Sequence, residues 1–300
     1  MSANAVRGLR ILVTGRDGQV GGELLHSLAS LGEVTATSRA ELDLASETSI
    51  QDAIRRARPQ LIVNAAAYTA VDKAESEPDL AQRVNVSAVV TLAAEAKTVG
   101  AAMIHYSTDY VFDGSKTTPY VEADATNPLS VYGRTKLAGE LALASAGIPY
   151  LILRTSWVYG AQGKNFLRTI LKLAAEKPEL RIVDDQIGAP TCAHDIAQAT
   201  AAIVRNWMTK DRDARSGIYH LTATGETSWY GFAAEAVRLR AMSEPRKTFA
   251  RLAPISTAEY PTPAARPKNS RLECGKLRNV FGVQLPDWKN SLANVVPSIH

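Results

Sequence analysis

The chain has 300 residues, 46% of them hydrophobic, and a formal net charge of +4. This composition is sufficient for a large core and indicates one large domain or two coupled lobes. No apolar run approaches the ~18 residues that a membrane span needs, and residues 1–10 lack the apolar core of a secretory signal. We therefore expect a cytoplasmic protein without a membrane segment.

The two cysteines and the mild charge exclude further classes of site. Cys192 and Cys274 lie far apart and form no CxxC motif, so neither a disulfide framework nor a zinc site is indicated. A small positive excess favours general solvation first and an anionic small molecule second, with nucleic acid a distant third. We expect no nucleic-acid partner.

Strand-like and helical stretches alternate along the first half of the chain. The apolar, β-rich runs are "RILVTG", "EVTATS", "QLIVNAAA", "AMIHYS" and "YLILRTSW". The helical stretches between them are "QVGGELLHSLASLG", "ASETSIQDAIRRA", residues 79–99 and "LSVYGRTKLAGELALASAG". This alternation predicts an α/β fold with a doubly wound, largely parallel sheet, a Rossmann-like domain over residues 1–156.

The alternation loosens after residue 156. Helices are predicted near 164–176, 194–207 and 228–241, and strands at "LRIVDD" and "GIYHLTA". We expect a smaller substrate-binding lobe over residues 157–300, interleaved so that segments near 180–222 return to the first domain. The biased stretch "STAEYPTPAARPKNSRL" predicts an ordered or ligand-gated loop.

A glycine motif stands between the first predicted strand and helix. In "VTGRDGQVGG", Gly15, Gly18 and Gly21 form GxxGxxG, and Gln19 and Val20 open the helix. A tight turn needs glycine, and a diphosphate approaching backbone N–H groups at a helix N-terminus leaves no room for Cβ atoms. The motif therefore predicts dinucleotide binding; an ordinary glycine-rich turn is the alternative.

The next strand bears on cofactor choice. It ends in "TATSRAELDL", without an acidic residue where ribose hydroxyls would be read, whereas Ser38 and Arg39 suit a 2′-phosphate. We therefore expect NADPH in preference to NADH. A surface arginine in a turn is the alternative reading.

Two more segments suit a bound cofactor. Asp43 and Leu44 resemble an adenine-contacting pair. Small residues directly after a strand let a cofactor lie along the carboxyl edge of the sheet. The residues at this place are Ala65, Ala66 and Ala67, for which simple small-residue packing is the alternative.

The stretch "VYGRTK" places a tyrosine one helical turn before a lysine. Pro128 suits the first turn of a helix, so Tyr132 and Lys136 are expected on one helix face. An ammonium near a phenol stabilises its anion and lowers its pKa, which would make Tyr132 a tunable acid. Thr108 ends the strand before, where its hydroxyl can polarise a carbonyl. YxxxK alone is common on helices, but its order after the glycine turn and the threonine favours catalysis.

These motifs resemble the extended short-chain dehydrogenase/reductase family, in the expected order. The stretches "NAAAYTAVDKAESEP", "HYSTDYVFDG", "LRTSWVYG", "DDQIGAPT" and "YPTPAARPKNSRL" resemble its dTDP-4-dehydrorhamnose reductase branch, over residues 10–289. The resemblance implies reduction of the C4 keto group of dTDP-6-deoxy-L-lyxo-4-hexulose by NADPH or NADH. It implies that Tyr132 is the general acid, that Lys136 holds the nicotinamide ribose and tunes Tyr132, and that Thr108 assists at the carbonyl.

The resemblance also implies a set of substrate contacts. Val71, Asp109 and Trp157 resemble substrate-contacting positions, with ordinary core packing as the alternative for Val71 and Trp157. In the tail, cationic and amide side chains suit a nucleotide diphosphate, and a solvated basic loop is the alternative. These tail residues are Arg266, Lys268, Asn269 and Arg271.

Other members of the superfamily remain as alternatives. Sugar-nucleotide 4,6-dehydratases place an Asp-Glu pair after the threonine, but here Asp109 is followed by Tyr110, so dehydration is disfavoured. An epimerase or another nucleotide-sugar reductase shares the same tyrosine, lysine and hydroxyl. The NADP-binding regulatory subunit of methionine adenosyltransferase resembles the same branch and would act as a partner protein.

Some members of the family carry a metal that bridges a dimer through glutamates. Glu23 fits one such position, but His194 stands where a second glutamate is expected. A first-turn helix glutamate, favoured by the helix dipole, is the simpler reading of Glu23. We therefore expect no metal site, and either a monomer or a homodimer.

Overall fold

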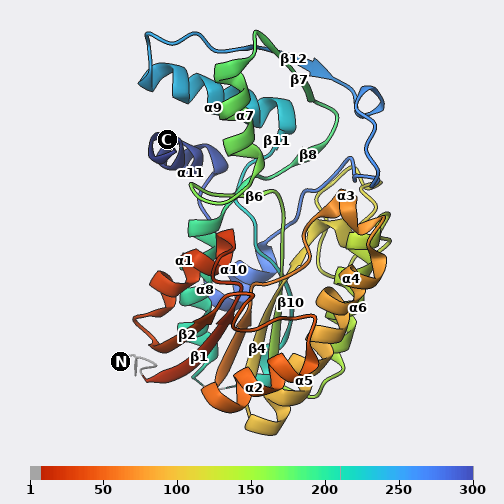
Figure 1. The fold of residues 1–300 in the computed structure, drawn as a ribbon, viewed down its shortest axis with the longest axis vertical. Helices are drawn as coiled ribbons and strands as arrows, with labels where there is room; N and C mark the ends of the chain where they lie inside the picture. The colour runs from red at the N-terminus through yellow and green to blue at the C-terminus, as the bar shows by residue number, and fades with distance from the viewer. Residues whose placement is uncertain (1–7, 210, 300) are drawn as a thin grey trace.

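A six-stranded sheet forms the centre of the larger lobe in this computed structural model, which describes residues 8–209 and 211–299 (Figure 1). The strands are β1 (Leu9–Thr14), β2 (Gly32–Thr37), β3 (Leu61–Asn64), β4 (Ala102–Thr108), β5 (Tyr150–Thr155) and β10 (Gly217–His220). They lie in the order β2-β1-β3-β4-β5-β10, and every neighbouring pair is parallel. The carboxyl ends of all six strands therefore lie at the same edge of the sheet.

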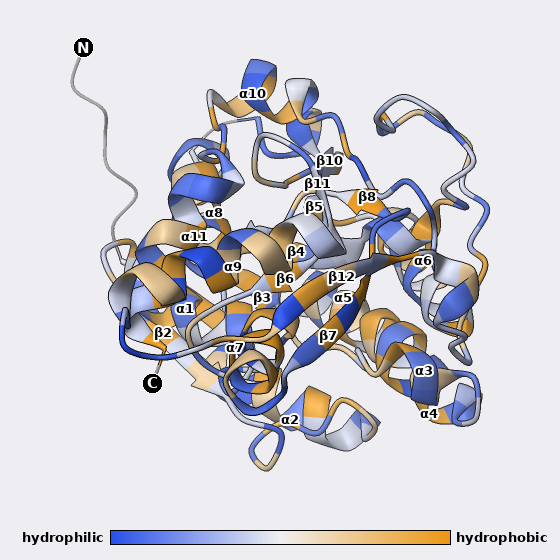
Figure 2. Ribbon diagram, turned by 90° about the horizontal axis from the view of Figure 1, so that it is seen from above, coloured by the Kyte–Doolittle hydropathy of each residue, from blue (hydrophilic) through white to orange (hydrophobic). Residues whose placement is uncertain are grey.

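Helices cover both faces of this sheet. One face packs on α1 (Gln19–Leu28), α8 (Ala193–Trp207) and α10 (Gly275–Phe281), and the other on α2 (Glu47–Ala57), α5 (Ala88–Val99) and α6 (Val131–Ala144). Along β1 the side chains alternate between the two cores, with Ile11 and Val13 in one and Leu12 in the other. The predicted doubly wound α/β fold is confirmed. Figure 2 shows helices such as α1 and α2 with both hydrophilic and hydrophobic stretches.

The segment between β3 and β4 departs from one continuous helix. The sequence predicts a helix over residues 79–99. The structure has α3 (Val71–Ala74), α4 (Pro78–Gln82), a π-helical turn η1 (Arg83–Ser87) and then α5. A π turn admits an extra residue, and such turns are frequent at functional sites.

The smaller lobe lies beyond the carboxyl edge of the sheet, at the top of Figure 1. Its helices α7 (Phe166–Glu176), α9 (Trp229–Ser243) and α11 (Trp288–Val295) share two hydrophobic clusters with β7 (Glu179–Val183). Short strands pair around them: β7 with β12 (Arg251–Ile255), β8 (Ile187–Gly188) with β11 (Thr227–Ser228), and β6 (Val158–Tyr159) with β9 (Thr191–Cys192). The short helices are η2 (Asp109–Val111), η3 (Asp213–Arg215), η4 (Thr257–Glu259) and η5 (Val296–Ser298).

The chain crosses between the two lobes more than once. α8 packs on α1 and β10 joins the large sheet, whereas β7, at 179–183, pairs with β12 in the smaller lobe. The predicted domain boundary at residue 156, with residues near 180–222 rejoining the larger lobe, stays a prediction. In this structure the elements of that segment that pack in the larger lobe are α8 and β10.

Candidate active site

A cavity of about 780 Å³ opens at the carboxyl ends of the large-sheet strands and extends to α7 and α9 of the smaller lobe. Ligands of doubly wound folds bind at this edge. Of the predicted site residues, those that line it are Gly15, Gly18, Gln19, Val20, Arg39, Asp43, Leu44, Ala65, Ala66, Ala67, Val71, Thr108, Asp109, Tyr132, Lys136 and Trp157. Those that do not are Gly21, Ser38, Arg266, Asn269 and Arg271.

The glycine turn joins β1 to α1 in the way that the motif predicts. Gly15 has φ +76°, and a Cβ atom on it would lie 2.9 Å from the Cβ atom of Ala66. At Gly21 a Cβ atom would lie 1.9 Å from the Gly15 carbonyl oxygen. The turn is therefore a bare backbone cradle at the N-terminus of a helix, and this cradle fits the diphosphate of a dinucleotide.

The end of β2 carries an acidic side chain that the sequence pattern did not reveal. Glu41 accepts hydrogen bonds from the Ser38 backbone N–H and from the Ser38 hydroxyl, both at 2.8 Å, and pairs with Arg16. These contacts hold the pKa of Glu41 below its usual range. The expectation that no carboxylate lies at this turn is wrong, because Glu41 folds back onto Ser38; Arg39 remains exposed at the cavity rim.

The loop after β3 is held by a buried asparagine on the π turn. The side chain of Asn85 accepts from the Tyr68 backbone N–H (2.9 Å) and donates to the Tyr68 carbonyl (3.2 Å). It also donates to the Thr135 hydroxyl on α6 (3.1 Å). Asn85 thus fixes the loop containing Ala65–Ala67 relative to α6. Sequence reasoning missed it, and its only signal is a polar residue on the buried side of a predicted helix.

Helix α6 brings Tyr132 to the cavity beside the end of β4. The helix begins at Val131, and the hydroxyl of its N-cap residue Ser130 accepts from the Gly133 N–H at 3.1 Å. The prediction that Pro128 lies in the first turn is wrong, since the buried Ser130 starts the helix. Tyr132 contacts the Thr108 hydroxyl, so a phenol and a second hydroxyl face one cavity.

The expected direction of the Tyr132 pKa is also wrong. Burial raises the pKa of Tyr132, the Thr108 hydroxyl opposes that rise, and the charge of Asp109 adds to it. The ammonium of Lys136, whose Nζ donates to the Tyr106 carbonyl oxygen at 2.6 Å, does not offset this effect of burial. In this state Tyr132 is a neutral phenol, which is the form that an acid needs before it gives up a proton.

Lys136 stands at the end of a buried hydrogen-bonded chain. Its Nζ lies 3.1 Å from His105 Nε2, and His105 Nδ1 lies 2.9 Å from Asn64 Nδ2. Asn64 Oδ1 accepts from the Thr14 hydroxyl at 2.6 Å, and that hydroxyl accepts from the Ala66 N–H. Burial lowers the pKa of Lys136 to about 8, against the opposing charge of Glu140. Sequence reasoning missed His105, although a polar residue in an apolar strand is a visible signal.

Asp109 is buried at the floor of the cavity. One carboxylate oxygen accepts from the Thr108 hydroxyl at 3.0 Å, whereas Oδ2 has no partner among the described residues. Burial raises the pKa of Asp109 to about 6, although the hydroxyls of Ser270 and Thr108 lower it. An unpartnered buried polar atom that faces a cavity marks a place for a ligand donor.

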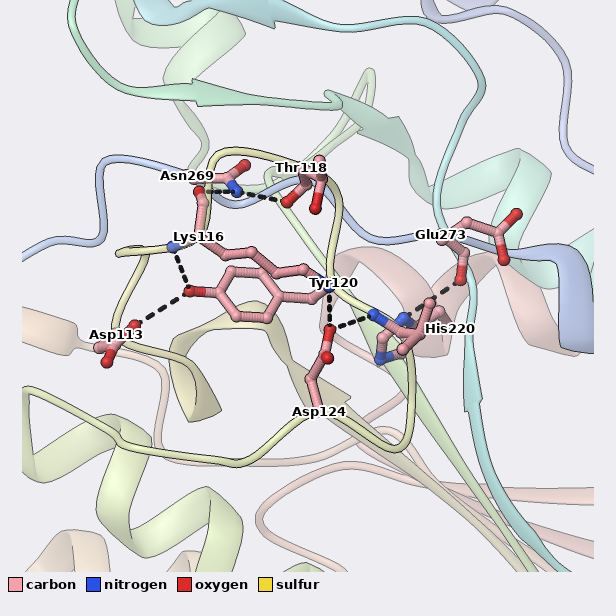
Figure 3. A network of polar contacts seen from close by, with 9 residues as sticks. Asp113, Lys116, Thr118, Tyr120, Asp124, His220, Asn269 and Glu273 are labelled. Carbon is pink, nitrogen blue, oxygen red and sulfur yellow. Dashed lines mark hydrogen bonds and ion pairs between the residues drawn. The ribbon is translucent and has the colours of Figure 1, made fainter.

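The predicted tail contacts lie away from the cavity lining. Asn269 donates to the carbonyl oxygens of Lys116 (2.7 Å) and Thr118 (2.9 Å), as Figure 3 shows. Arg271 donates to the Thr117 carbonyl and pairs with Glu226 at 3.0 Å. These two side chains therefore hold the segment that follows β4 rather than face the cavity.

Arg266 contacts the larger lobe through an ion pair. Its guanidinium donates to Asp72 Oδ2 at 2.8 Å, next to Val71 at the start of α3. The side chain is about one quarter exposed, and its charge lowers the pKa of Tyr110, which burial raises. Tyr110 lies edge-on to Tyr132 with ring centroids 5.5 Å apart. Arg266 is therefore near the reacting group although it does not line the cavity.

The two residues weighed for a metal lie together at the surface. His194 Nδ1 is 3.0 Å from Glu23 Oε2, joining α8 to α1. Within residues 8–209 and 211–299, no group of three or more His, Cys, Asp or Glu side chains could hold a metal ion. The expected absence of a metal stays a prediction.

A parallel doubly wound sheet, a glycine cradle and a tyrosine–lysine–threonine group at one cavity define a nicotinamide-dependent oxidoreductase of the extended short-chain dehydrogenase/reductase class. The model of the RmlD substrate binding domain family matches residues 9–300. The chain belongs to this family. The relatives to which it is similar are dTDP-4-dehydrorhamnose reductases. The one from Burkholderia thailandensis is 50% identical, over 94% of this chain and 96% of its own length. The one from Escherichia coli K12 is 47% identical, over 94% and 95%.

Solved structures agree with this assignment. A dTDP-4-dehydrorhamnose reductase from Clostridium acetobutylicum superposes with a TM-score of 0.88 at 37% identity, covering 96% of this chain and 98% of its own. One from Bacillus anthracis, solved in complex with NADP, has a TM-score of 0.86 at 34% identity and the same coverage. The predicted family, fold and enzyme class are confirmed. Among the helices described, none combines the length and apolarity needed to cross a bilayer.

Proposed function

We propose that this protein reduces the C4 keto group of dTDP-6-deoxy-L-lyxo-4-hexulose to give dTDP-L-rhamnose, with NADPH or NADH as the cofactor. One observation carries the proposal: Tyr132 and Thr108 present adjacent hydroxyls to a cavity that also holds Lys136 and a glycine cradle. The relatives at 46–50% identity over nearly their whole length carry the same name.

The cofactor would lie along the carboxyl edge of the sheet, where it supplies a hydride. Gln19, Val20 and Gly21, at the start of α1, hold its diphosphate through their backbone N–H groups. Gly15 and Gly18 form the tight turn beneath it, and their own N–H groups donate to the Thr37 and Gly15 carbonyl oxygens. Its adenosine end lies at Ser38, Arg39, Asp43 and Leu44, and its nicotinamide half passes Ala65, Ala66 and Ala67. Exposed Arg39 is the cation available to a 2′-phosphate, whereas Glu41 at the same turn suits ribose hydroxyls.

Three side chains carry out the reduction. Tyr132 donates a hydrogen bond to the keto oxygen and then gives its proton to that oxygen as charge develops there. Thr108, whose hydroxyl donates to Asp109 in this structure, turns its proton to the keto oxygen when the substrate binds. The ammonium of Lys136 stabilises the tyrosinate that remains and binds the nicotinamide ribose. Val71, Asp109 and Trp157 contact the sugar nucleotide, and Arg266 is the tail cation for its diphosphate. Asn269 and Arg271, which the sequence also suggested for the diphosphate, instead bind the carbonyl oxygens of residues 116–118.

The alternatives are weaker on specific grounds. Dehydration needs a second carboxylate after Thr108 and Asp109, but Tyr110 occupies that place. A regulatory subunit of the methionine adenosyltransferase type needs no sugar-nucleotide site, and an epimerase needs the same tyrosine and lysine. We propose that the protein works in the cytoplasm, without a metal, as a monomer or a homodimer.

The decisive experiment follows NADPH and then NADH oxidation by absorbance, with enzymatically generated dTDP-6-deoxy-L-lyxo-4-hexulose as the substrate. The wild type is expected to oxidise cofactor and form dTDP-rhamnose. Tyr132→Phe is expected to lose about 10²-fold or more in kcat while its Kd for NADPH is unchanged, because only the proton donor is removed.

A matched control separates chemistry from folding. The hydroxyl of Tyr219 donates to the Arg215 carbonyl on the far side of the sheet, so Tyr219→Phe removes a phenol hydroxyl outside the cavity. It should leave kcat within about twofold of the wild type. Full activity in Tyr132→Phe would contradict the proposed acid, and no turnover by the wild type would contradict the proposed reaction.

A further inference from the structure

Trp157 is held on both faces of its ring. On one face it lies so close to the backbone of Gly188 that a Cβ atom there would be 2.6 Å from Trp157 Cε2. On the other face it stacks on Trp229, with ring centroids 3.7 Å apart and ring planes 12° apart. We call Gly188 and Trp229 the tryptophan clamp. Both of its residues belong to the smaller lobe, whereas Trp157 directly follows the end of the large-sheet strand β5.

The backbone of Trp157 requires such support. Its φ angle is +47°, in the left-handed region that bulky side chains rarely adopt. Unfavoured backbone angles persist only where the surroundings fix them, and they concentrate at functional sites. The clamp therefore holds Trp157 in a conformation that the loop alone would not favour.

The clamp is itself fixed at several points. β8 pairs with β11, which places Gly188 opposite Thr227, two residues before Trp229 at the start of α9. The indole N–H of Trp229 donates to Gln186 Oε1 at 3.2 Å, and the ring of Phe166 lies behind it at 4.6 Å. Trp229 is therefore anchored by a strand pair, a hydrogen bond and an aromatic neighbour.

Trp157 and Trp229 differ in whether the indole N–H is free to bind a ligand. Both residues line the cavity. Among the described residues no acceptor meets the indole N–H of Trp157, whereas that of Trp229 is already bound to Gln186. A clamped, half-buried indole with a spare N–H suits a polar ligand that needs a fixed wall and one donor.

We propose that Trp229 is a positioning residue for the sugar nucleotide, acting through Trp157, whose ring it holds in place against Gly188. The inference rests on the function proposed above and adds a residue that contributes to substrate placement without taking part in proton transfer. Among the described residues, no hydrogen bond joins Gly188 or Trp229 to the glycine cradle, so the clamp should affect binding of the sugar nucleotide and leave cofactor binding unchanged.

The test compares three clamp variants in the full-length protein. Trp229→Ala removes the stacked ring, Trp229→Phe retains an aromatic face, and Gly188→Ala displaces Trp157 from the opposite side. We expect Trp229→Ala to raise the KM for the keto sugar nucleotide about 10-fold, the scale of a lost aromatic pair. Its kcat should stay within about threefold, its Kd for NADPH should not change, and Trp229→Phe should recover most of the KM.

Gly188→Ala decides whether the effect passes through Trp157. It leaves Trp229 intact, so a similar rise in KM supports the clamp, and an unchanged KM overturns it. Equal losses in KM and in NADPH Kd for Trp229→Ala also overturn the proposal, because they indicate general damage to the lobe. As a control, Tyr230→Leu alters the neighbouring residue, which packs against a cluster that Trp229 also contacts but does not line the cavity, and should leave the KM unchanged.

Circular dichroism keeps this result separate from the proposed reaction. Two indoles stacked at this distance couple their transitions and give a paired positive and negative band in the far ultraviolet. The wild type should show this signal, and Trp229→Phe and Trp157→Phe should each lose it. In Trp229→Ala, loss of the signal without any change in KM overturns the positioning role, whereas a wild type that shows the signal but reduces no keto sugar contradicts the proposed function alone.

Discussion

At the scale of single residues, the buried carboxylate of Asp109 lowers the stability of the folded protein at neutral pH. Asp109 is 3% exposed, one of its oxygens has no partner among the described residues, and its pKa is raised from 3.8 to about 6. The folded protein therefore binds the proton of Asp109 more tightly than the unfolded chain does. Stability from this group is complete below pH 4 and is lost as the pH rises through about 6.

Asp109→Asn should therefore stabilise the protein at pH 7. An amide keeps the acceptor for the Thr108 hydroxyl and removes the buried charge, whose cost is on the order of 3 kcal/mol. We expect Tm to rise by about 5 °C at pH 7 and by nothing at pH 4. Thermal unfolding at both pH values measures this. Asp52→Asn, on an exposed face of α2, is the charge-matched control, and an equal gain at both pH values would refute the explanation.

Sequence was informative about the residues whose chemistry is local. Gly15 is required by its φ of +76° and Gly21 by its approach to the Gly15 carbonyl within the same turn, so the motif was sufficient to place them. His105 and Asn85 were missed, because their roles depend on Lys136 and Tyr68, 31 and 17 positions away along the chain. The Tyr132 pKa was predicted in the wrong direction because spacing gives the position of Lys136 but not the burial of the phenol, which is the largest effect on its pKa.

At the scale of elements, helix α6 determines how accurately the reacting groups are placed. Its N-terminal turn packs so closely on η2 that a Cβ atom on Gly133 would lie 2.2 Å from the Tyr110 carbonyl oxygen. The helix start therefore fixes Tyr132 relative to Thr108. The sequence predicted the helix and the common face of Tyr132 and Lys136, but it placed the start at Pro128 because the buried serine cap depends on packing.

Ser130→Ala should loosen this start. It removes the N-cap acceptor of the Gly133 N–H, which costs about 1 kcal/mol. We expect kcat to fall about fivefold as well, because the turn that carries Tyr132 loses its anchor. Ser46→Ala removes the equivalent cap from α2, away from the cavity, and should lower stability by a similar amount with no change in kcat. Denaturant unfolding and steady-state kinetics check both, and equal kcat values for the two variants would contradict the role of the α6 cap.

At the scale of the whole molecule, the tail that follows β12 is bound to the smaller lobe at one place and to the larger lobe at two. Ile187 N–H donates to the Lys268 carbonyl within the smaller lobe, Asn269 binds the segment after β4, and Arg266 pairs with Asp72 on α3. The sequence showed the bias of this stretch and suggested diphosphate contacts. It could not show that these side chains bind other parts of the chain, since such pairs are separated by more than 150 positions.

Arg266 is the tail residue whose two roles can be separated. If it only ties the lobes together, Arg266→Met and Asp72→Asn break the same ion pair and should have equal effects. We expect them to differ. Asp72→Asn removes a partly exposed pair and should raise the KM for the sugar nucleotide by at most about fivefold. Arg266→Met also removes a charged donor for the diphosphate, so its KM should rise by about 10- to 100-fold. Steady-state kinetics with NADPH held saturating measure both, and the larger effect should shrink at high salt. Equal KM values for the two variants would restrict Arg266 to joining the lobes.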